Sequence, residues 1–239
     1  MLKKRLDNLL LEKGLAESRS QAQGLILAGK VTVDGIVLSK SGNLVREDSR
    51  IDIAQKPPFV SRGGIKLARA LDEFQIDVTS SIVLDIGAST GGFTDCLLQR
   101  GAGKVYAIDV GYGQIDYKLR QDPRVIVLDK TNVHYPFSIP EKADLAAVDL
   151  SFISVTKVIP NIMEHLSQSG RLIILLKPQF EAERREVGKK GIIKDAQVHA
   201  RVLGRFISWM VGYGLRLGGL IASPIYGTEG NKEFLLLYR

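Results

Sequence analysis

Hydrophobic and polar positions follow helical spacing first and then strand spacing at the start of the chain, up to about Ala54. Leucines recur at helical intervals in RLDNLLLEKG, and a second helical stretch follows in SRSQAQGLILAG, where Ser18 can cap the start and Gly29 marks the end. VTVDGIVL predicts a hairpin that turns at Asp34-Gly35, and RIDIA predicts one further strand. Two helices, a hairpin and a strand in so short a stretch indicate a small module.

A different pattern begins after QKPPFVSRGG, whose paired prolines and glycines are typical of a linker. Short apolar runs then alternate with helical stretches. The predicted strands are IVLDIG, KVYAIDV, RVIVLD, ADLAAVDLSF and RLIILLKPQF, with a helix after IVLDIG and further helices at QIDYKLR and VTKVIPNIMEHL. Such alternation is typical of an α/β fold with a parallel sheet covered by helices on both faces.

The last part of the chain completes this pattern. EAERREVGKKGIIK is too charged for a core and is predicted to be a mobile loop. A long helix from about Asp195 to Gly212 follows, and two strands, LRLGGLIASP and EFLLLYR, would close the sheet. We therefore predict an α+β module at residues 1–56, a linker at 57–64 and an α/β domain at 65–239.

Composition narrows the class of protein. The chain has 239 residues, of which 45% are hydrophobic and 25% charged, as in globular proteins. The longest apolar runs, such as LIILL, suit strands and are too short for a membrane span, and the N-terminus does not resemble a signal peptide. The sequence therefore predicts a cytoplasmic protein that does not enter a membrane. A net charge of +7 favours a polyanionic partner.

Cysteine and histidine exclude several kinds of site. Cys96 is the single cysteine, so an intrachain disulfide or a cysteine metal cluster is impossible. The three histidines, His134, His165 and His199, lack the spacing of metal ligands. We therefore expect no metal.

A glycine-rich stretch, LDIGASTGGF, follows the first strand of the larger domain and precedes a helix. Its glycines would let the backbone approach a ligand closely. A phosphate-binding P-loop would need Lys and then Ser or Thr where Phe93 and Thr94 stand. A dinucleotide-binding fingerprint would need glycine in place of Ser89. The spacing alone leaves the ligand open.

Acidic residues at the strand ends favour one kind of ligand over the others. Asp85 closes the first strand, where a carboxylate disfavours a pyrophosphate and favours a cation, and Asp109 ends the second strand, where an acid accepts hydrogen bonds from ribose hydroxyls. S-adenosylmethionine is a cationic nucleoside without phosphates and satisfies both. Asp129 and Asp149 end later strands and would converge on the same edge of the sheet. An ordinary turn with polar residues at strand ends is the alternative.

Lys177 emerges from the apolar run LIILLKPQF. A lysine at the end of so apolar a strand is partly desolvated, which favours its neutral form and suits it to proton abstraction. It can instead pair with Asp149.

The first region resembles the small alpha-L RNA-binding domain, named after the fourth small-subunit ribosomal protein. The matching residues run from RLDNLLLEKG through ESRSQAQ to GKVTVDGIVL. In that family the second helix and the following turn bind structured RNA, so the resemblance implies this role for Arg19, Gln21 and Lys30. The neighbouring basic residues Lys3, Lys4 and Arg5 could follow a phosphate backbone.

A second resemblance covers the rest of the chain. Lys66 in SRGGIKL, Asp149 in AVDLSFIS, Lys177 in LLKPQFE and Glu233 in GNKEF match the Lys-Asp-Lys-Glu tetrad of FtsJ-like RNA ribose 2'-O-methyltransferases. With the alpha-L domain, the whole chain is similar to the TlyA family, also called hemolysin A. The resemblance implies a Rossmann-like class I methyltransferase fold and methylation of cytidine ribose in ribosomal RNA or ribosomal subunits. The cofactor, S-adenosyl-L-methionine, would be bound by Asp85, Gly87, Ala88, Ser89, Thr90, Gly91, Gly92, Phe93, Asp109, Asp129 and Asp149.

The chemistry assigns roles within the tetrad. A ribose 2'-hydroxyl is a weak nucleophile, so it must be aligned with the methyl group and its proton removed. Lys177 is the expected base and Asp149 would orient it, while Lys66 and Glu233 would hold the ribose.

Several alternative functions remain to be considered. A membrane-damaging hemolysin would need a spanning helix or lipid-facing strands, which the sequence does not offer. A non-catalytic RNA-binding factor for ribosome assembly would not need the tetrad or the cofactor loop. A pseudouridine synthase would need neither Asp85 nor the glycines, and a NAD-dependent dehydrogenase would need the missing fingerprint glycine.

Overall fold

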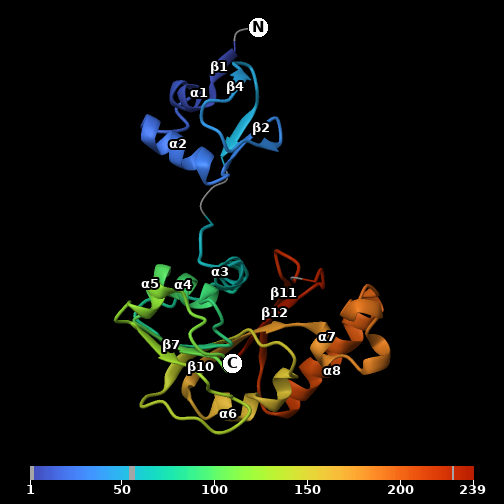
Figure 1. The fold of residues 1–239 in the computed structure, drawn as a ribbon. Helices are drawn as coiled ribbons and strands as arrows, with labels where there is room; N and C mark the ends of the chain where they lie inside the picture. The colour runs from blue at the N-terminus through green and yellow to red at the C-terminus, as the bar shows by residue number, and fades with distance from the viewer. Residues whose placement is uncertain (1–2, 54–56, 228) are drawn as a thin grey trace. The chain divides into compact units, whose positions relative to one another are not determined.

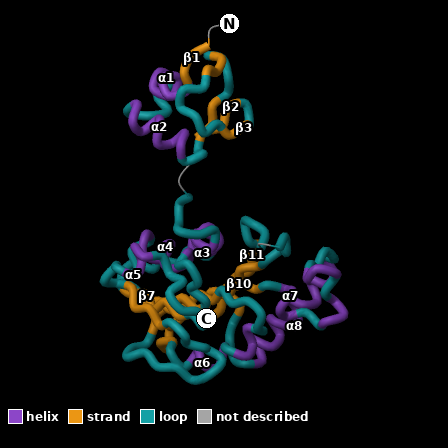
Figure 2. The backbone as a smooth tube through the Cα atoms, in the orientation of Figure 1, coloured by secondary structure: helices purple, strands orange, loops and turns teal. Residues whose placement is uncertain are grey.

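The computed structural model describes residues 3–53, 57–227 and 229–239, and it divides into two compact units, Met1–Pro57 and Pro58–Arg239. Figures 1 and 2 show the course of the chain through each unit. Each unit has its own hydrophobic core, so each is described separately.

The smaller unit contains the helices and the hairpin that the sequence predicts. Its elements are β1 (Lys3–Arg5), α1 (Leu6–Glu12), α2 (Arg19–Leu27), β2 (Val31–Val33), β3 (Ile36–Val37), β4 (Leu44–Arg46) and β5 (Ile51–Ile53). The Ser18 hydroxyl caps α2 by accepting a hydrogen bond from the Gln21 N–H at 3.2 Å. Asp34 and Gly35 both have positive φ, +50° and +82°, as a tight hairpin turn requires.

Two features of this unit differ from the prediction. β1 and β4 form an antiparallel pair that the sequence did not indicate, because each strand has only three residues. The predicted strand RIDIA forms β5, but its last residue, Ala54, lies outside the described residues. A separate three-stranded sheet has the order β3-β2-β5.

The larger unit contains a seven-stranded sheet with the order β11-β12-β10-β9-β6-β7-β8. Its strands are β6 (Ile82–Ile86), β7 (Lys104–Ile108), β8 (Val125–Leu128), β9 (Ala143–Val148), β10 (Leu166–Leu176), β11 (Leu217–Ala222) and β12 (Phe234–Tyr238). The five strands β10, β9, β6, β7 and β8 are parallel, but β12 runs antiparallel to both its neighbours. The sheet is therefore mixed, not wholly parallel as the alternation predicted.

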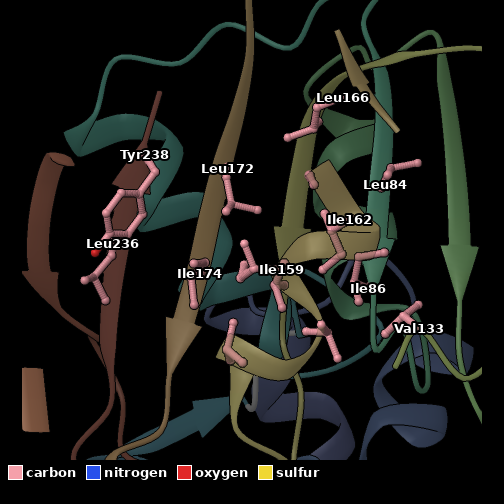
Figure 3. Close-up of a cluster of buried hydrophobic side chains, with 14 of the residues drawn as sticks. Leu84, Ile86, Val133, Ile159, Ile162, Leu166, Leu172, Ile174, Leu236 and Tyr238 are labelled. Carbon is pink, nitrogen blue, oxygen red and sulfur yellow. The ribbon is translucent and has the colours of Figure 1, made fainter. Parts of the chain in front are cut away.

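Helices cover both faces of this sheet, and alternate residues of each strand reach opposite faces. The helices are α3 (Gly63–Glu73), α4 (Gly92–Gln99), α5 (Tyr117–Arg120), α6 (Ile159–Met163), α7 (Pro178–Glu181) and α8 (Ala196–Gly212). Val83 and Leu145 pack with α3 and α4 on one face. On the other face, Leu84 and Ile174 pack with residues of α6 such as Ile162, as Figure 3 shows. The core thus has three layers.

Two segments depart from the predicted elements. The helix α3 begins at Gly63 and overlaps the predicted linker, and Phe59 packs with the core beside α3 and α4. The helix predicted over VTKVIPNIMEHL is broken into a 3-10 turn, Val155–Lys157, and α6, because Pro160 lies in the first turn of α6 and cannot continue a preceding helix.

The charged segment predicted to be a loop contains short helical turns. Arg184–Glu186 and Lys189–Gly191 form 3-10 turns, and the Glu186 carboxylate accepts hydrogen bonds from Arg201 and Arg205 of α8. These partners, Arg205 first, lower the pKa of Glu186 to about 2. The mobility of this segment stays a prediction. None of the helices in the described part of the chain is both long and apolar enough to cross a bilayer.

Candidate functional site

The loop LDIGASTGGF follows β6, where the strand order of the sheet reverses: the chain continues to β7 and β8 on one side of β6 and then to β9 on the other. Ligands bind at such switch points because the loops diverge there. Gly87 and Gly91 have φ values of +85° and +93°, which glycine adopts at little cost. A Cβ at Gly87 would also collide with the backbone carbonyl of Asp149 at the end of β9. The glycines thus bring the loop against the neighbouring strand.

Asp109 fixes the outer side of this loop. Its carboxylate accepts hydrogen bonds from the backbone N–H of Ser89 at 2.8 Å and of Gly111 at 2.7 Å. A cavity of about 320 Å³ lies beside it, with Asp109 on its wall. Much of the remaining wall is apolar and comes from Ile108, Val110, Val133, Leu150 and Phe152. A largely apolar cavity with acids at two positions, Asp109 and Asp149, is suited to a nucleoside.

A second cavity, of about 260 Å³, contains all four residues of the predicted tetrad. Lys66 Nζ lies 2.5 Å from Glu233 Oε2, and Lys177 Nζ lies 2.6 Å from Asp149 Oδ1. Lys66 comes from α3, Asp149 follows β9, Lys177 follows β10 and Glu233 precedes β12. The fold therefore collects the tetrad from four elements into two ion pairs.

The first two cavities share Gly87, Ser89 and Asp149 as wall residues. Together they offer apolar walls, the Asp109 carboxylate as an acceptor for ribose hydroxyls, and a loop whose backbone a ligand can approach at Gly87, which has no side chain. Ser89, Thr90 and Phe93 of the loop also line the second cavity. These features fit S-adenosylmethionine, with the nucleoside beside Asp109.

Ser151 belongs to the site but is not among the residues predicted from the sequence. Its hydroxyl oxygen lies 2.8 Å from Lys177 Nζ and accepts a hydrogen bond from it. Lys177 is therefore ion-paired with Asp149 and hydrogen-bonded to Ser151. The signal available in the sequence was proximity: Ser151 is two residues from Asp149 in AVDLSF, directly after a strand.

A third cavity, of about 440 Å³, has Lys177 and Glu233 on its wall but no residue of the glycine loop. Ser151 and Gln179 contribute polar groups to its wall. Phe152 contributes an aromatic ring to the wall and is 90% exposed. Its φ of +65° is a strained conformation for an aromatic residue. Its ring centroid lies 5.2 Å from that of Phe180.

Two predicted cofactor-binding acids do not line these cavities. Asp85 is 0% exposed because it shares the pleat of Val83 and points toward α4, where Thr94 Oγ1 donates a hydrogen bond to it at 2.6 Å. Burial raises the pKa of Asp85 to about 7. Asp129 is ion-paired with Arg120 at 2.9 Å. Of the four strand-end acids, the cavity walls include Asp109 and Asp149.

The predicted RNA-binding residues of the smaller unit are partly organised by a buried acid. Asp7 is 0% exposed and lies 2.8 Å from Arg5 and 3.4 Å from Arg19, while Gln23 donates to it at 3.1 Å. The hydrogen bond from Arg5 is the main reason that the pKa of Asp7 is held well below its usual range. Arg5 and Arg19, from β1 and α2, are thereby placed side by side.

The other predicted RNA-binding residues have different surroundings. Lys4 is ion-paired with Glu12 and Glu47 at 2.6 and 3.0 Å. The Gln21 side chain accepts a hydrogen bond from the Glu17 N–H at 2.6 Å. Lys3 and Lys30 form no ion pair with any described residue, which leaves their charges available to a ligand. The described residues include no cluster of His, Cys, Asp and Glu side chains able to hold a metal ion.

Comparison with known proteins finds likeness over almost the whole chain. The FtsJ-like methyltransferase family matches residues 59–239, and the S4 domain, an RNA-binding domain, matches residues 4–51. Hemolysin A of Brachyspira hyodysenteriae is 44% identical over 97% of this chain and 98% of its own length. The 16S/23S rRNA (cytidine-2'-O)-methyltransferase TlyA of Mycobacterium tuberculosis is 42% identical over 98% of this chain and 89% of its own length.

A solved structure confirms the predicted fold class of the larger unit. An S-adenosylmethionine-dependent methyltransferase from Mesorhizobium loti aligns with a TM-score of 0.54 over 71% of this chain and 95% of its own. The two sequences are only 15% identical, so the likeness concerns the fold alone.

Proposed function

Because this chain belongs to the hemolysin A/TlyA family, in which an S4 domain precedes an FtsJ-like methyltransferase domain, we propose that it methylates the ribose 2'-hydroxyl of a cytidine in ribosomal RNA. The methyl donor is S-adenosylmethionine, and the RNA is presented as ribosomal RNA or as a ribosomal subunit. Such a substrate would place the enzyme in the cytoplasm.

One observation carries this proposal: the tetrad shares a cavity with the glycine loop. Lys66, Asp149, Lys177 and Glu233 line the same cavity as Gly87 and Ser89. A cofactor on the loop would therefore lie next to two lysines and two carboxylates. That arrangement can hold a hydroxyl, accept its proton and balance the resulting charge.

The nucleophile is activated by Lys177 in this proposal. A neutral amine has two N–H groups and one lone pair. If Ser151 Oγ accepts one N–H group, at 2.8 Å, and the nearby Asp149 carboxylate, 2.6 Å from Nζ, attracts the other, the lone pair occupies a remaining tetrahedral direction and can take the 2'-hydroxyl proton. The O–H bond breaks as the oxygen forms its new bond to carbon. S-adenosylmethionine would supply that carbon as a methyl group, whose bond to the positively charged sulfur would break and leave S-adenosylhomocysteine, and the proton would stay on Lys177.

Lys66 and Glu233 would position the ribose. Their ion pair is nearly closed to solvent, since Glu233 is 3% exposed and Lys66 9%. Buried charges held at 2.5 Å are rigid, and a ribose hydroxyl near them finds both a donor and an acceptor. We infer that this pair fixes the sugar while Lys177 acts on the 2'-oxygen.

The residues proposed to hold the cofactor are the loop from Gly87 to Phe93 together with Asp109 and Asp149. Asp109 has lone pairs left for ribose hydroxyls after accepting from Ser89 and Gly111. Calorimetry should detect binding of S-adenosylhomocysteine, and Asp109→Ala should weaken it. Binding of NADH in its place would refute the cofactor assignment.

The function is tested by mapping ribose methylation. The purified protein is incubated with S-adenosylmethionine and ribosomal subunits from cells that lack this protein. We expect one or a few cytidines whose 3' linkage becomes resistant to alkaline hydrolysis, because strand cleavage needs a free 2'-hydroxyl. Methylation confined to a base, or no transfer to RNA, would refute the proposal.

A further inference from the structure

The third cavity contains a buried acceptor without a partner. Gln179 lies in α7, two residues after Lys177, and its side-chain oxygen Oε1 is inaccessible to solvent and receives no hydrogen bond from any described residue. An unsatisfied buried carbonyl is destabilising, because it has lost its hydrogen bonds to water without gaining others. Such groups are rare in folded proteins, and Gln179 is a wall residue of this cavity, so a ligand that enters the cavity and displaces the atoms covering Oε1 would complete it.

The position of the cavity indicates which part of the substrate would fill it. Lys177 and Glu233 line both this cavity and the one that contains the whole tetrad. The glycine loop lines the first two cavities and contributes no residue to the third. If the cofactor occupies the first two, the third is left for the nucleotide whose ribose meets Lys177. Its base would then enter the cavity where Gln179 lies.

The polar groups of this cavity favour one kind of base. Glu229 and Glu233 supply carboxylates, and Gln179 Oε1 is a further acceptor. Cytosine carries an exocyclic amine, N4, that donates hydrogen bonds, whereas uracil carries a carbonyl oxygen at the same position. Carboxylates repel that oxygen and attract the amine.

We propose that the third cavity is the site for the target base and that Gln179 Oε1 selects cytosine by accepting a hydrogen bond from its N4 amine. This inference rests on the proposed function and adds to it a residue that determines base specificity. Gln179 is not required for the methyl transfer itself. Its loss is therefore expected to reduce discrimination between bases.

The test compares two RNA substrates. Ribosomal subunits are reconstituted from a transcript that carries the mapped target cytidine and from a matched transcript with uridine at that position. We expect the wild-type enzyme to methylate the cytidine substrate with a kcat/KM at least about tenfold higher than the uridine substrate.

Variants of Gln179 separate the acceptor from the rest of the side chain. Gln179→Met keeps the shape and removes the polar atoms, so kcat/KM for cytidine should fall about 10- to 100-fold while that for uridine changes little. Gln179→Glu keeps an acceptor and should retain the preference for cytidine. Gln121→Met, at an exposed glutamine after α5, is the matched control and should behave as wild type.

The outcomes are distinguishable. Binding of S-adenosylhomocysteine by calorimetry verifies that each variant is folded, and Gln179→Ala replaces the Met variant if that one is not. An unchanged cytidine-to-uridine ratio in a folded variant without the acceptor would overturn the role of Gln179 and leave the proposed function intact. Absence of ribose methylation by the wild-type enzyme on either substrate would overturn both.

Discussion

Replacement of Asp85 by Asn should change how the stability of the larger unit depends on pH. Asp85 is fully buried, and burial raises its pKa from 3.8 to about 7. Between these two values the unfolded chain loses the proton and the folded chain keeps it. The stabilisation is therefore complete below about pH 4 and is lost as pH rises toward 7. Asn cannot ionise, so the variant lacks this dependence.

The size of the effect follows from the two pKa values. The two pKa values differ by about three units, and each unit corresponds to about 1.4 kcal/mol. As pH rises from 4 to 8, the free energy of unfolding of wild type should therefore fall by roughly 4 kcal/mol, a decrease that the variant lacks. Against this, Asp85 Oδ1 has no hydrogen-bond partner among the described residues, and the Asn N–H₂ placed there would cost about 1–3 kcal/mol at every pH. The variant should thus be no more stable than wild type at pH 4 and about 1–3 kcal/mol more stable at pH 8.

Urea unfolding followed by tryptophan fluorescence measures this difference. Trp209, the single tryptophan, lies in α8, so its signal reports on the larger unit. The free energies of unfolding of Asp85→Asn and wild type are compared from pH 4 to pH 8. A difference that stays constant across this range would show that Asp85 is ionised in the folded protein and would refute the reasoning.

The same variant tests whether Asp85 contacts the cofactor. Because Asp85 lies outside the cavity walls, Asp85→Asn should change the affinity for S-adenosylhomocysteine by less than about threefold, that is, by less than 1 kcal/mol. A loss of tenfold or more at pH 7.5 would instead support the direct contact that the sequence predicted.

Three further predictions concern the site and the RNA-binding unit. Lys177→Ala should lower kcat by about 100-fold or more without weakening S-adenosylhomocysteine binding, and Lys177→Arg should be equally inactive, because a guanidinium cannot act as a base; turnover by the Arg variant would make Lys177 an electrostatic stabiliser instead. Ser151→Ala should lower kcat up to about tenfold and leave KM for the cofactor unchanged, with activity restored in Ser151→Thr; an Ala variant with wild-type kcat would remove Ser151 from the mechanism. Arg19→Ala should weaken RNA binding and reduce the slope of log affinity against log salt by about one. Arg50→Ala is the matched control, because Arg50 is 81% exposed and ion-paired with Asp52. Equal effects of the two substitutions would argue against a specific role for Arg19.

Local sequence predicted those features of the site that lie close together along the chain. The glycine loop follows its strand directly, and Asp109 ends the next strand, so both could be placed from the strand pattern alone. Asp85 was different, because the direction of a side chain at a strand end depends on the pleat and on what covers it. Val83 and Asp85 share one face, which α4 covers, so the carboxylate meets Thr94 and not the ligand cavity.

Other parts could not be predicted because short range patterns are weak there. The helix α3 begins with two glycines after a proline-rich stretch, and its first residues were interpreted as linker, although Leu67, Ala70 and Leu71 follow helical spacing. Ser151 and Gln179 are ordinary polar residues in the sequence. Ser151 is notable only because Lys177 Nζ donates a hydrogen bond to it. Gln179 is notable only because no described residue donates a hydrogen bond to its Oε1.

The sequence by itself determined the two modules, the alternation of strands and helices, the glycine loop, and the family pattern in which the tetrad was recognised. Only the tertiary structure decided which of these residues meet. Lys66 and Glu233 are 167 positions apart and lie 2.5 Å from each other because β12, the last strand, enters the sheet beside β10 and brings the residue before it to α3. Distances between residues remote in the chain depend on strand order, and strand order follows from how the whole set of apolar faces packs, which no local pattern records.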